Sequence, residues 1–462
     1  MVALSKLLYH GLLLAPQRIF EDVASPQQAS VEQFNVINFL GGSAPYKQRS
    51  GVGISTDVPE TCSVEQVQMI SRHGERYPSK GDGVAFRKVL DKLQQYGKNF
   101  KGDLSFLNTY EYFVSDDELY EKETSPQNSE GPYAGTSDAL RHGAYFRARY
   151  KDLFANANAT LPVFTTNSGR VYQTAQYFAR GALGEEYSED KVEYVVVDES
   201  EKMGANSLTP RYACNTNLDK SSDANSELVD SYDTTYLQNI LDRWTKDNPG
   251  LNLTKSEVSS LFLWSAFEIN VRGWSPFTEL FTNEEYIKSG YRTDFGNYYQ
   301  IGPGNNMSTT VGSAMVAASL KLLQGSSDHR TWLMFTHDTD MEIYFSSMGL
   351  IELETGLPAH VVLPNPYNAA EMFPQGGRTY MEKLQCGGQQ YVRFIMNDAV
   401  VPYPKCTSGI GFSCPLEEFV EIVSRRMAGV SYRDQCNSSV PTELSFFWDY
   451  HEVRYDAPLI DQ

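Results

Sequence analysis

VEQVQMISRHGERYP, residues 64–78, joins an apolar, strand-like run to a loop in which one histidine lies between two arginines. The apolar run predicts a β-strand that ends at His73. Ligand sites in open α/β sheets lie at the carboxyl ends of such strands. The stretch therefore predicts an α/β fold in which His73 stands at a ligand site.

The residues of this loop suit the transfer of a phosphoryl group. Arg72 and Arg76 carry planar guanidinium groups, which bind phosphate through two bonds and stay charged at any working pH. The unprotonated imidazole of His73 is a competent nucleophile toward phosphorus. Gly74 lets the backbone turn sharply close to a phosphate. The alternative is a loop histidine that simply bonds a neighbouring group.

A second Arg-His-Gly triplet, residues 141–143, stands in a different context. It lies in SDALRHGAYFRARYKDLF, residues 137–154, whose apolar residues recur at helical spacing. No strand precedes it and no Arg-x-Pro follows. We therefore interpret His142 as a surface or inter-helix histidine.

Two further strand-like segments end in residues that suit a phosphate site, and a third apolar run covers 193–200. LPVFTTNSGR, 161–170, ends at Arg170, and RTWLMFTHDTDME, 330–342, carries His337 and Asp338. If these strands share one sheet with the first, their ends converge. Taken singly, Arg170 fits a solvated arginine near a helix start, and Asp338 fits a helix cap.

Asp338 supplies the proton donor that the first loop lacks. A leaving alkoxide needs a proton, and a carboxyl beside a bound anion tends to have a raised pKa. We therefore expect a raised pKa for Asp338, so that the carboxyl is protonated in acid. A protonated His337 would add another donor to the phosphate.

The charge of the chain excludes two classes of partner. The 462 residues carry a formal net charge of −19, from 58 acidic and 39 basic residues. Such a surface repels nucleic acids and anionic membranes, and no apolar run reaches the length of a membrane span. It also disfavours anionic substrates at neutral pH. Since the pI is about 4.9, a phosphate site predicts work in acid.

The cysteines and sequons favour an oxidising compartment outside the cytosol. Six scattered cysteines without a CxxC pair make a zinc site unconvincing and suggest three disulfides among 15 pairings. A bridge could close the short loop between Cys406 and Cys414. Four glycosylation sequons begin at Asn158, Asn252, Asn306 and Asn437.

The N-terminal segment allows two interpretations. Residues 1–15 carry Lys6 and a short apolar stretch from 7 to 15, which resembles a secretory signal. The alternative is an arm over residues 1–50 that packs on the body or contacts a second subunit in a homo-oligomer. Further along, 225–300 reads as helical, 309–324 as one helix and 387–403 as a hairpin-rich segment.

With RHGERYP at 72–78, NSGRVYQTAQYFARG at 167–181 and FTHDTD at 335–340, the chain resembles the histidine acid phosphatases, most closely yeast phytases and yeast acid phosphatases. The resemblance implies a large α/β domain with a central mixed sheet flanked by helices, and a smaller, mainly helical cap over the active-site cleft. We assign 51–95, 160–205 and 305–462 to the α/β domain, and 96–159 and 206–304 to the cap.

The resemblance also implies roles and pairings. His73 would form a phosphohistidine, Asp338 would protonate the leaving group, and neither a metal nor another cofactor would be needed. Substrates would be small phosphorylated molecules, phytate and other phosphomonoesters, outside the cell. The phosphate would be bound by Arg72, Arg76, Arg170 and His337, and the implied disulfides are Cys62–Cys386, Cys214–Cys436 and Cys406–Cys414.

Glu75 leaves the substrate range open. Filamentous-fungal phytases typically have alanine at this position, so Glu75 would add negative charge beside the phosphate and is a candidate for specificity. A broad acid phosphatase with little phytase activity is the main alternative. A phosphate mutase or sugar bisphosphatase, or a non-catalytic phosphate-binding cell-wall protein, fits the motifs less well.

Overall fold

The computed structural model describes residues 34–97, 99–154, 160–214, 223–326, 329–436 and 439–460. The apolar stretch 7–15, most of the proposed arm, and the sequons at Asn158 and Asn437 lie outside these residues. Asn252 and Asn306, the other two sequon asparagines, are exposed. No helix in the described part of the chain is long and apolar enough to cross a membrane.

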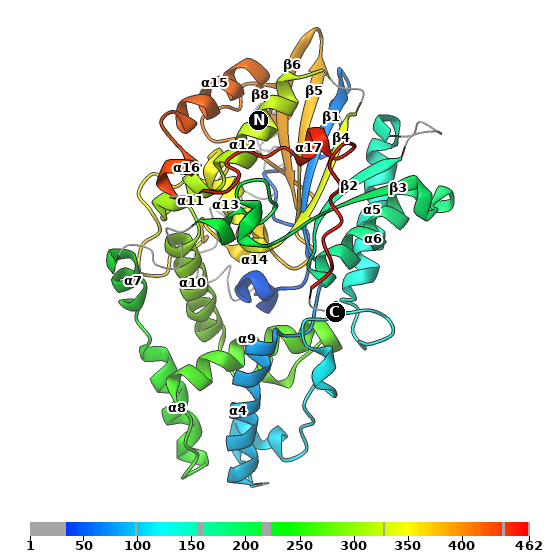
Figure 1. Ribbon diagram of the computed structural model, residues 1–462. Helices are drawn as coiled ribbons and strands as arrows, with labels where there is room; N and C mark the ends of the chain where they lie inside the picture. The colour runs from blue at the N-terminus through cyan, green and yellow to red at the C-terminus, as the bar shows by residue number, and fades with distance from the viewer. Residues whose placement is uncertain are drawn as a thin grey trace, which may run out of the picture.

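An eight-stranded mixed sheet forms the centre of the molecule (Figure 1). Its order is β3-β2-β4-β1-β5-β6-β7, and β8 pairs with β6. The first four strands of this order are parallel, and β5, β6, β7 and β8 are antiparallel to their neighbours. The strands are β1 Cys62–Arg72, β2 Leu161–Thr166, β3 Val192–Val197, β4 Thr331–Thr336, β5 Arg378–Cys386, β6 Gln389–Met396, β7 Ala399–Val401 and β8 Cys414–Pro415.

Helices cover both faces of the sheet, which explains why its central strands are apolar runs rather than alternating ones. Every residue of β2 and β4 is buried. On one face, Phe146 of α5 and Phe178 of α6 join a core with Val67 and Phe335 of the sheet. On the other face lie α12, α13 and α15 (Figure 1). This arrangement confirms the predicted fold class.

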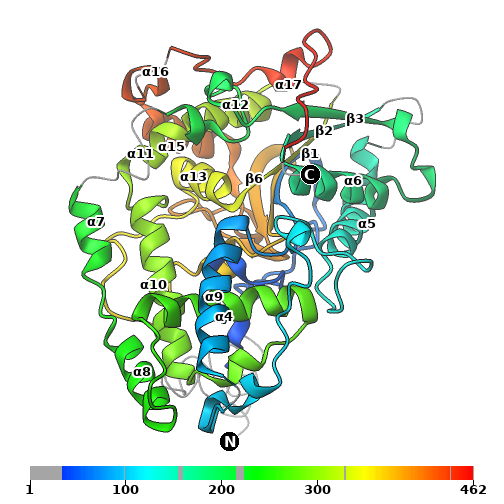
Figure 2. The same cartoon turned by 60° about the horizontal axis from the view of Figure 1, so that its bottom comes forward.

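A mainly helical group lies beyond one end of the sheet, and α4, α8, α9 and α10 belong to it (Figures 1 and 2). Its interior is aromatic. The Trp264 ring is 5.2 Å from Phe86, 4.9 Å from Tyr112 and 5.1 Å from Phe277, measured between ring centroids. Such contacts add to the burial of large apolar side chains.

The helices of the described residues are the following. The α-helices are α4 Lys80–Tyr96, α5 Gly135–Phe154, α6 Gly169–Leu183, α7 Asp223–Asp230, α8 Thr235–Asp247, α9 Lys255–Arg272, α10 Asn283–Gln300, α11 Asn306–Val311, α12 Ser313–Gln324, α13 Asp338–Met348, α14 Ala369–Met372, α15 Leu416–Met427, α16 Tyr432–Gln435 and α17 Phe446–Asp449. The longer 3-10 segments are η1 Val36–Phe39, η3 Gly102–Asn108, η8 Pro210–Ala213 and η10 Pro276–Glu279.

Two helices make contacts that favour domain boundaries other than the predicted ones. Helix α4, which we assigned to the α/β domain, contacts α9 through Phe86 and Trp264. Helix α5, which we assigned to the cap, packs on α6 and the sheet through Phe146. We therefore propose a cap that includes α4 and excludes α5.

The helix predicted over 309–324 is interrupted at Gly312, where a Cβ atom would lie 2.1 Å from Ser347 Oγ.

Three disulfides join the six cysteines as Cys62–Cys386, Cys214–Cys436 and Cys406–Cys414. These are the pairs that the resemblance implied. The first links β1 directly to β5, because the two cysteines are partners in the strand register.

We expect the disulfides to contribute unequally to stability. The Cys62–Cys386 bridge spans 324 residues and Cys406–Cys414 only 8. Because a longer closed loop restricts the unfolded chain more, replacing the first pair with alanines should lower the free energy of unfolding by about 5 kcal/mol, against about 2.5 kcal/mol for the second. Thermal unfolding of the two double variants checks this. Equal decreases in Tm would contradict it.

Candidate active site

The carboxyl ends of the four parallel strands meet at one edge of the sheet. His73 follows β1, His337 follows β4, Arg170 follows β2 by four residues, and Glu199 follows β3 by two. Arg72 is the register partner of Thr336, so the first two ends are adjacent. The convergence expected from the sequence is therefore present in the fold.

The His73 side chain is buried and held in one orientation. Its Nδ1 lies 2.8 Å from the Gly74 carbonyl oxygen. Since a carbonyl only accepts, Nδ1 donates its proton there and the lone pair stands on Nε2. The ring lies edge-on to His337, with 5.7 Å between centroids. The tautomer with the proton on Nδ1 and the lone pair on Nε2 is the one that a nucleophilic Nε2 requires.

Burial lowers the pKa of His73 well below 6.5, and the nearby cations Arg72, Arg170 and Arg76 lower it further. A lowered pKa means that the imidazole stays neutral at pH values where a free histidine is protonated. The neutral imidazole of His73 can therefore act as a nucleophile in acid.

The three arginines are positioned by different contacts. Arg72 donates to the carbonyl oxygens of Gly42 and, at 2.8 Å, of Phe373. The guanidinium of Arg76 lies 5.1 Å from the centroid of the Phe267 ring. Arg170 forms an ion pair of 3.0 Å with Glu121, which the sequence analysis did not single out.

Glu199 is a functional partner that the sequence analysis missed. Its Oε1 lies 2.7 Å from His337 Nε2. The pKa of Glu199 is lowered: burial opposes ionisation, but the hydrogen bond and charge of His337 outweigh it. The hydrogen bond to Glu199 therefore holds the His337 ring in a fixed orientation at the sheet edge. The position of Glu199 just after an apolar strand was the available indication.

Asp338 is the first residue of α13, and the charges around it determine the direction of its pKa shift. Burial alone would raise the pKa, but the net shift is downward because Arg72 and His337 stabilise the carboxylate. Arg72 Nη2 lies 3.0 Å from Asp338 Oδ2. The rise expected from the sequence concerns a carboxyl beside a bound phosphate, so it stays a prediction for the phosphate-bound enzyme. His337, not Asp338, is the N-cap residue of α13.

A cavity of about 790 Å³ opens between this sheet edge and the helical group. Arg72, Arg76 and Asp338 lie on its wall together with Lys255 and Arg292 from α9 and α10. The wall formed by α9 and α10 therefore adds the cations Lys255 and Arg292 to Arg72 and Arg76 at the sheet edge. This cavity can take a ligand with several anionic groups.

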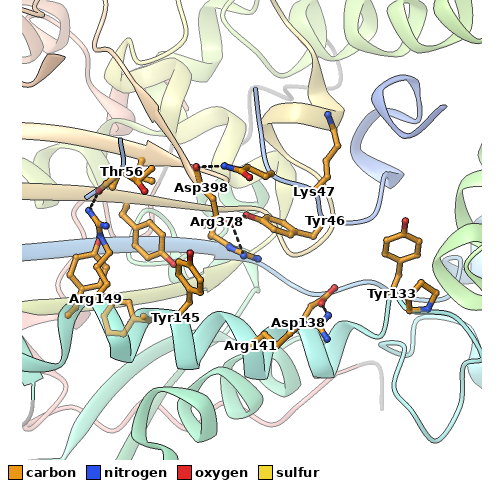
Figure 3. A pocket seen from close by; sticks show the side chains of 16 residues that line it. Tyr46, Lys47, Thr56, Tyr133, Asp138, Arg141, Tyr145, Arg149, Arg378 and Asp398 are labelled. Carbon is orange, nitrogen blue, oxygen red and sulfur yellow. Dashed lines mark hydrogen bonds and ion pairs between the residues drawn. The ribbon is translucent and has the colours of Figure 1, made fainter. Parts of the chain in front are cut away.

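Glu75 does not line this cavity. Its side chain is fully buried, and its Oε1 accepts a hydrogen bond of 2.7 Å from the Tyr46 N–H. Tyr46 and Arg378 line a second cavity of about 510 Å³, where the Arg378 guanidinium lies 3.4 Å from the Tyr46 ring centroid (Figure 3). A direct contact between Glu75 and a ligand in the larger cavity is therefore incompatible with this geometry.

His142 lies between elements, as expected. It is buried on α5, its Nε2 is 2.5 Å from the Tyr380 hydroxyl, and its ring lies against Phe178 of α6. Among the described residues, one group of three potential metal ligands is close enough to share an ion, Cys406, Cys414 and Glu418. Its two cysteines are joined to each other in a disulfide, so the group has no free thiolate.

Comparison with known proteins found a matching family, similar proteins and a similar crystal structure. The family model described as histidine phosphatase superfamily (branch 2) matches residues 63–397. A phytase of Candida albicans is 54% identical over 464 residues, 99% of this chain and 100% of that protein. The constitutive acid phosphatase of Saccharomyces cerevisiae is 42% identical over 442 residues, 93% of each chain. The crystal structure of the phytase from D. castellii superimposes with a TM-score of 0.90 at 50% identity, covering 97% of this chain and 98% of the other.

Proposed function

The chain belongs to the histidine phosphatase superfamily (branch 2), and we propose that it is an acid phosphatase with phytate among its substrates, acting through a phosphohistidine at His73. One observation carries the proposal: His73 presents an unprotonated Nε2 within a cluster of Arg72, Arg76 and Arg170. A nucleophile surrounded by fixed cations suits attack on an anionic phosphorus centre.

The reaction divides into two displacements. In the first, the lone pair of His73 Nε2 forms a bond to phosphorus while the ester P–O bond breaks, and the Asp338 carboxyl gives its proton to the leaving oxygen. In the second, a water molecule attacks phosphorus, its proton passes to the Asp338 carboxylate, and the P–N bond breaks. Free phosphate leaves, and both side chains return to their starting state.

Low pH and a bound substrate both favour the protonated form of Asp338 that the first step needs. In the structure Arg72 keeps the pKa of Asp338 low. A bound phosphate dianion would share Arg72 with the carboxylate and oppose its negative charge, which favours protonation. The fraction of Asp338 that can donate a proton therefore increases as the pH falls, while His73 stays neutral because its own pKa is lowered.

The test is release of phosphate from p-nitrophenyl phosphate and from phytate between pH 3 and pH 7. We expect turnover of both, with higher activity in the acidic half of the range. Turnover of p-nitrophenyl phosphate alone would indicate a broad acid phosphatase with little phytase activity. No turnover of either substrate would overturn the proposal.

Phytate carries phosphates beyond the one attacked, and the far wall of the cavity has groups to bind them. Lys255 is exposed, and Arg292 Nη1 donates to Ser259 Oγ at 3.2 Å on the same wall. A charge-assisted hydrogen bond contributes about 1.5–3 kcal/mol. These cations support phytate as a substrate of the cavity.

Replacing Arg292 and Lys255 by alanine should therefore separate the two substrates. We expect KM for phytate to increase about tenfold for each variant, with little change for p-nitrophenyl phosphate, which has one phosphate. Lys246→Ala, an exposed cation of α8 outside the cavity, is the control. Equal changes for both substrates would contradict this role.

We propose that the enzyme works outside the cytosol. Three disulfides hold the fold, and the sequon residues Asn252 and Asn306 are exposed where a glycan could be attached. Treatment with an N-glycosidase should increase the mobility of the protein produced by its natural host. The homo-oligomer through the N-terminal arm also remains a proposal, and a sizing column on a form lacking the arm tests it.

A further inference from the structure

Two carboxyl groups with no part in the two displacements lie buried behind the nucleophile. Glu75 is 0% and Glu123 is 1% exposed. Each has one oxygen with a hydrogen-bond partner, and the other oxygen, Oε2, has none. Burying such groups is costly, so their position calls for a function.

Glu123 is bonded to the peptide that joins His73 to Gly74. Its Oε1 accepts from the Gly74 N–H at 3.1 Å and from Thr174 Oγ1 at 2.6 Å, and the same N–H also donates to Thr174 Oγ1 at 2.9 Å. On the other side of the same peptide, the His73 carbonyl oxygen accepts from the Gly376 N–H at 2.7 Å. The peptide is therefore clamped from both sides, and the Gly74 carbonyl oxygen beyond it accepts from His73 Nδ1.

The approach of Glu123 also explains why residue 74 is glycine. A Cβ atom there would lie 2.3 Å from Glu123 Oε1 and 2.7 Å from Gly135 Cα. No side chain fits at that distance without displacing its neighbours. The glycine of the Arg-His-Gly triplet thus provides the space in which Glu123 contacts the backbone.

The segment that carries Glu123 is fixed to the nucleophile loop by its backbone. Glu123 forms a β-bridge with Arg76, the Tyr77 N–H donates to Lys122 O at 2.9 Å, and the Thr124 N–H donates to Glu75 O at 2.7 Å. Because of these bonds, a movement of the Glu123 side chain would be transmitted to the loop.

We propose that Glu123 is a positioning residue for the nucleophile: it fixes the His73–Gly74 peptide, and the charge of Glu75 determines the pH range in which it does so. The proposal rests on the proposed function, because it concerns the orientation of His73 for attack on phosphorus.

The electrostatic surroundings of the two groups differ. The pKa of Glu123 is raised to about 8: burial raises it most and the charge of Glu75 adds to the rise, while Thr174, the Gly74 N–H and Arg170 oppose it. Burial also raises the pKa of Glu75, but the Tyr46 N–H, Arg378 and Arg141 counteract it. Figure 3 shows Tyr46, Arg378 and Arg141 around the second cavity.

The other groups that interact with Glu75 are Arg72 and Tyr133. Arg378 and Arg141 favour the ionised form of Glu75, whereas Glu123, with a pKa of about 8, stays neutral in acid. At higher pH, ionisation of Glu123 would place two like charges together in the interior, which is destabilising. The segment of Glu123 would then move away from Gly74, and His73 would lose its orientation.

The test is the burst of nitrophenolate from p-nitrophenyl phosphate, followed by stopped flow from pH 5 to pH 9. This leaving group needs almost no proton, so Asp338 does not determine the rate. We expect the burst rate of the wild-type enzyme to fall near pH 8. Glu123→Gln keeps the acceptor oxygen and cannot ionise, so its rate should stay level to pH 9.

Glu75→Gln should also flatten the pH dependence. Without the neighbouring charge, ionisation of Glu123 no longer places two like charges together, so the rate should stay closer to level up to pH 9 than in the wild type. Glu123→Ala should lower the burst rate about 10- to 100-fold at pH 5 with little change in KM, because orientation and not binding is lost. Glu118→Gln, an exposed neighbour on the same segment, is the control.

The outcomes are distinguishable. A wild-type protein with no burst and no phosphohistidine at pH 5 would overturn the proposed function itself. A normal wild-type burst with the same pH dependence in the wild type, Glu123→Gln and Glu75→Gln would overturn only the positioning role. If Glu123→Ala does not fold, the flattened pH dependence of the two glutamine variants relative to the wild type still decides the question.

Discussion

His73→Ala is expected to lower kcat on phosphomonoesters by about 10⁵-fold or more, since the variant has no nucleophile to form the covalent intermediate. Folding should be little affected, because the imidazole makes one side-chain hydrogen bond, to the carbonyl oxygen of the adjacent Gly74. The measurement is twofold: steady-state release of p-nitrophenol, and ³²P on the protein after a rapid quench into alkaline denaturant, in which phosphohistidine survives.

The control is the second Arg-His-Gly triplet. His142 is also buried and also follows an arginine, but it bonds the Tyr380 hydroxyl between α5 and the sheet. His142→Gln should retain phosphoenzyme formation and nearly full kcat. Label that remains on the His73→Ala protein would refute the assignment of the nucleophile.

Asp338→Asn should reduce kcat according to the leaving group. Phytate and glycerol phosphate release alkoxides, which need a proton, so we expect losses of about 10²- to 10⁴-fold. Nitrophenolate leaves without one, so the loss on p-nitrophenyl phosphate should stay below about tenfold. A plot of log kcat against leaving-group pKa should become steeper in the variant.

Asp340→Asn is the matched control for this experiment. Asp340 lies one residue beyond Thr339 in the first turn of the same helix, is buried and pairs with Arg211 at 3.2 Å. The Asp340→Asn change should alter kcat by the same factor for all leaving groups, because Asp340 does not donate the proton to the leaving oxygen. If log kcat depends on the leaving-group pKa in the same way in the wild type and in Asp338→Asn, then Asp338 is not the proton donor.

The candidate site could be predicted because its main members follow directly from local patterns. His73, Arg170 and His337 each stand within a few residues of the end of an apolar strand, and parallel strands bring such ends to one edge. The residue types then indicate the chemistry. The elements were correct wherever an apolar run was bounded by polar residues, as in β1, β2 and β4.

Partners from distant parts of the chain could not be predicted in this way. Glu199, Glu121 and Glu123 reach His337, Arg170 and Gly74 through the packing of separate segments, and no local pattern distinguishes them from other glutamates among the 58 acidic residues. The domain segments differed at α4 and α5 for the same reason, since an amphipathic helix does not indicate which apolar surface it will cover.

The sequence by itself predicted the class of fold, the proposed nucleophile, the proposed anion-binding arginines and the His337-Asp338 pair after β4, because these depend on strand periodicity and residue type. Only the tertiary structure decided where the charges act. It placed Glu75 behind the loop instead of in the cavity, brought Arg72 within 3.0 Å of Asp338 so that the pKa of this carboxyl is lowered, and put Glu123 against Gly74. A pKa and a hydrogen bond depend on distance and burial, and both arise when segments far apart in the chain pack together.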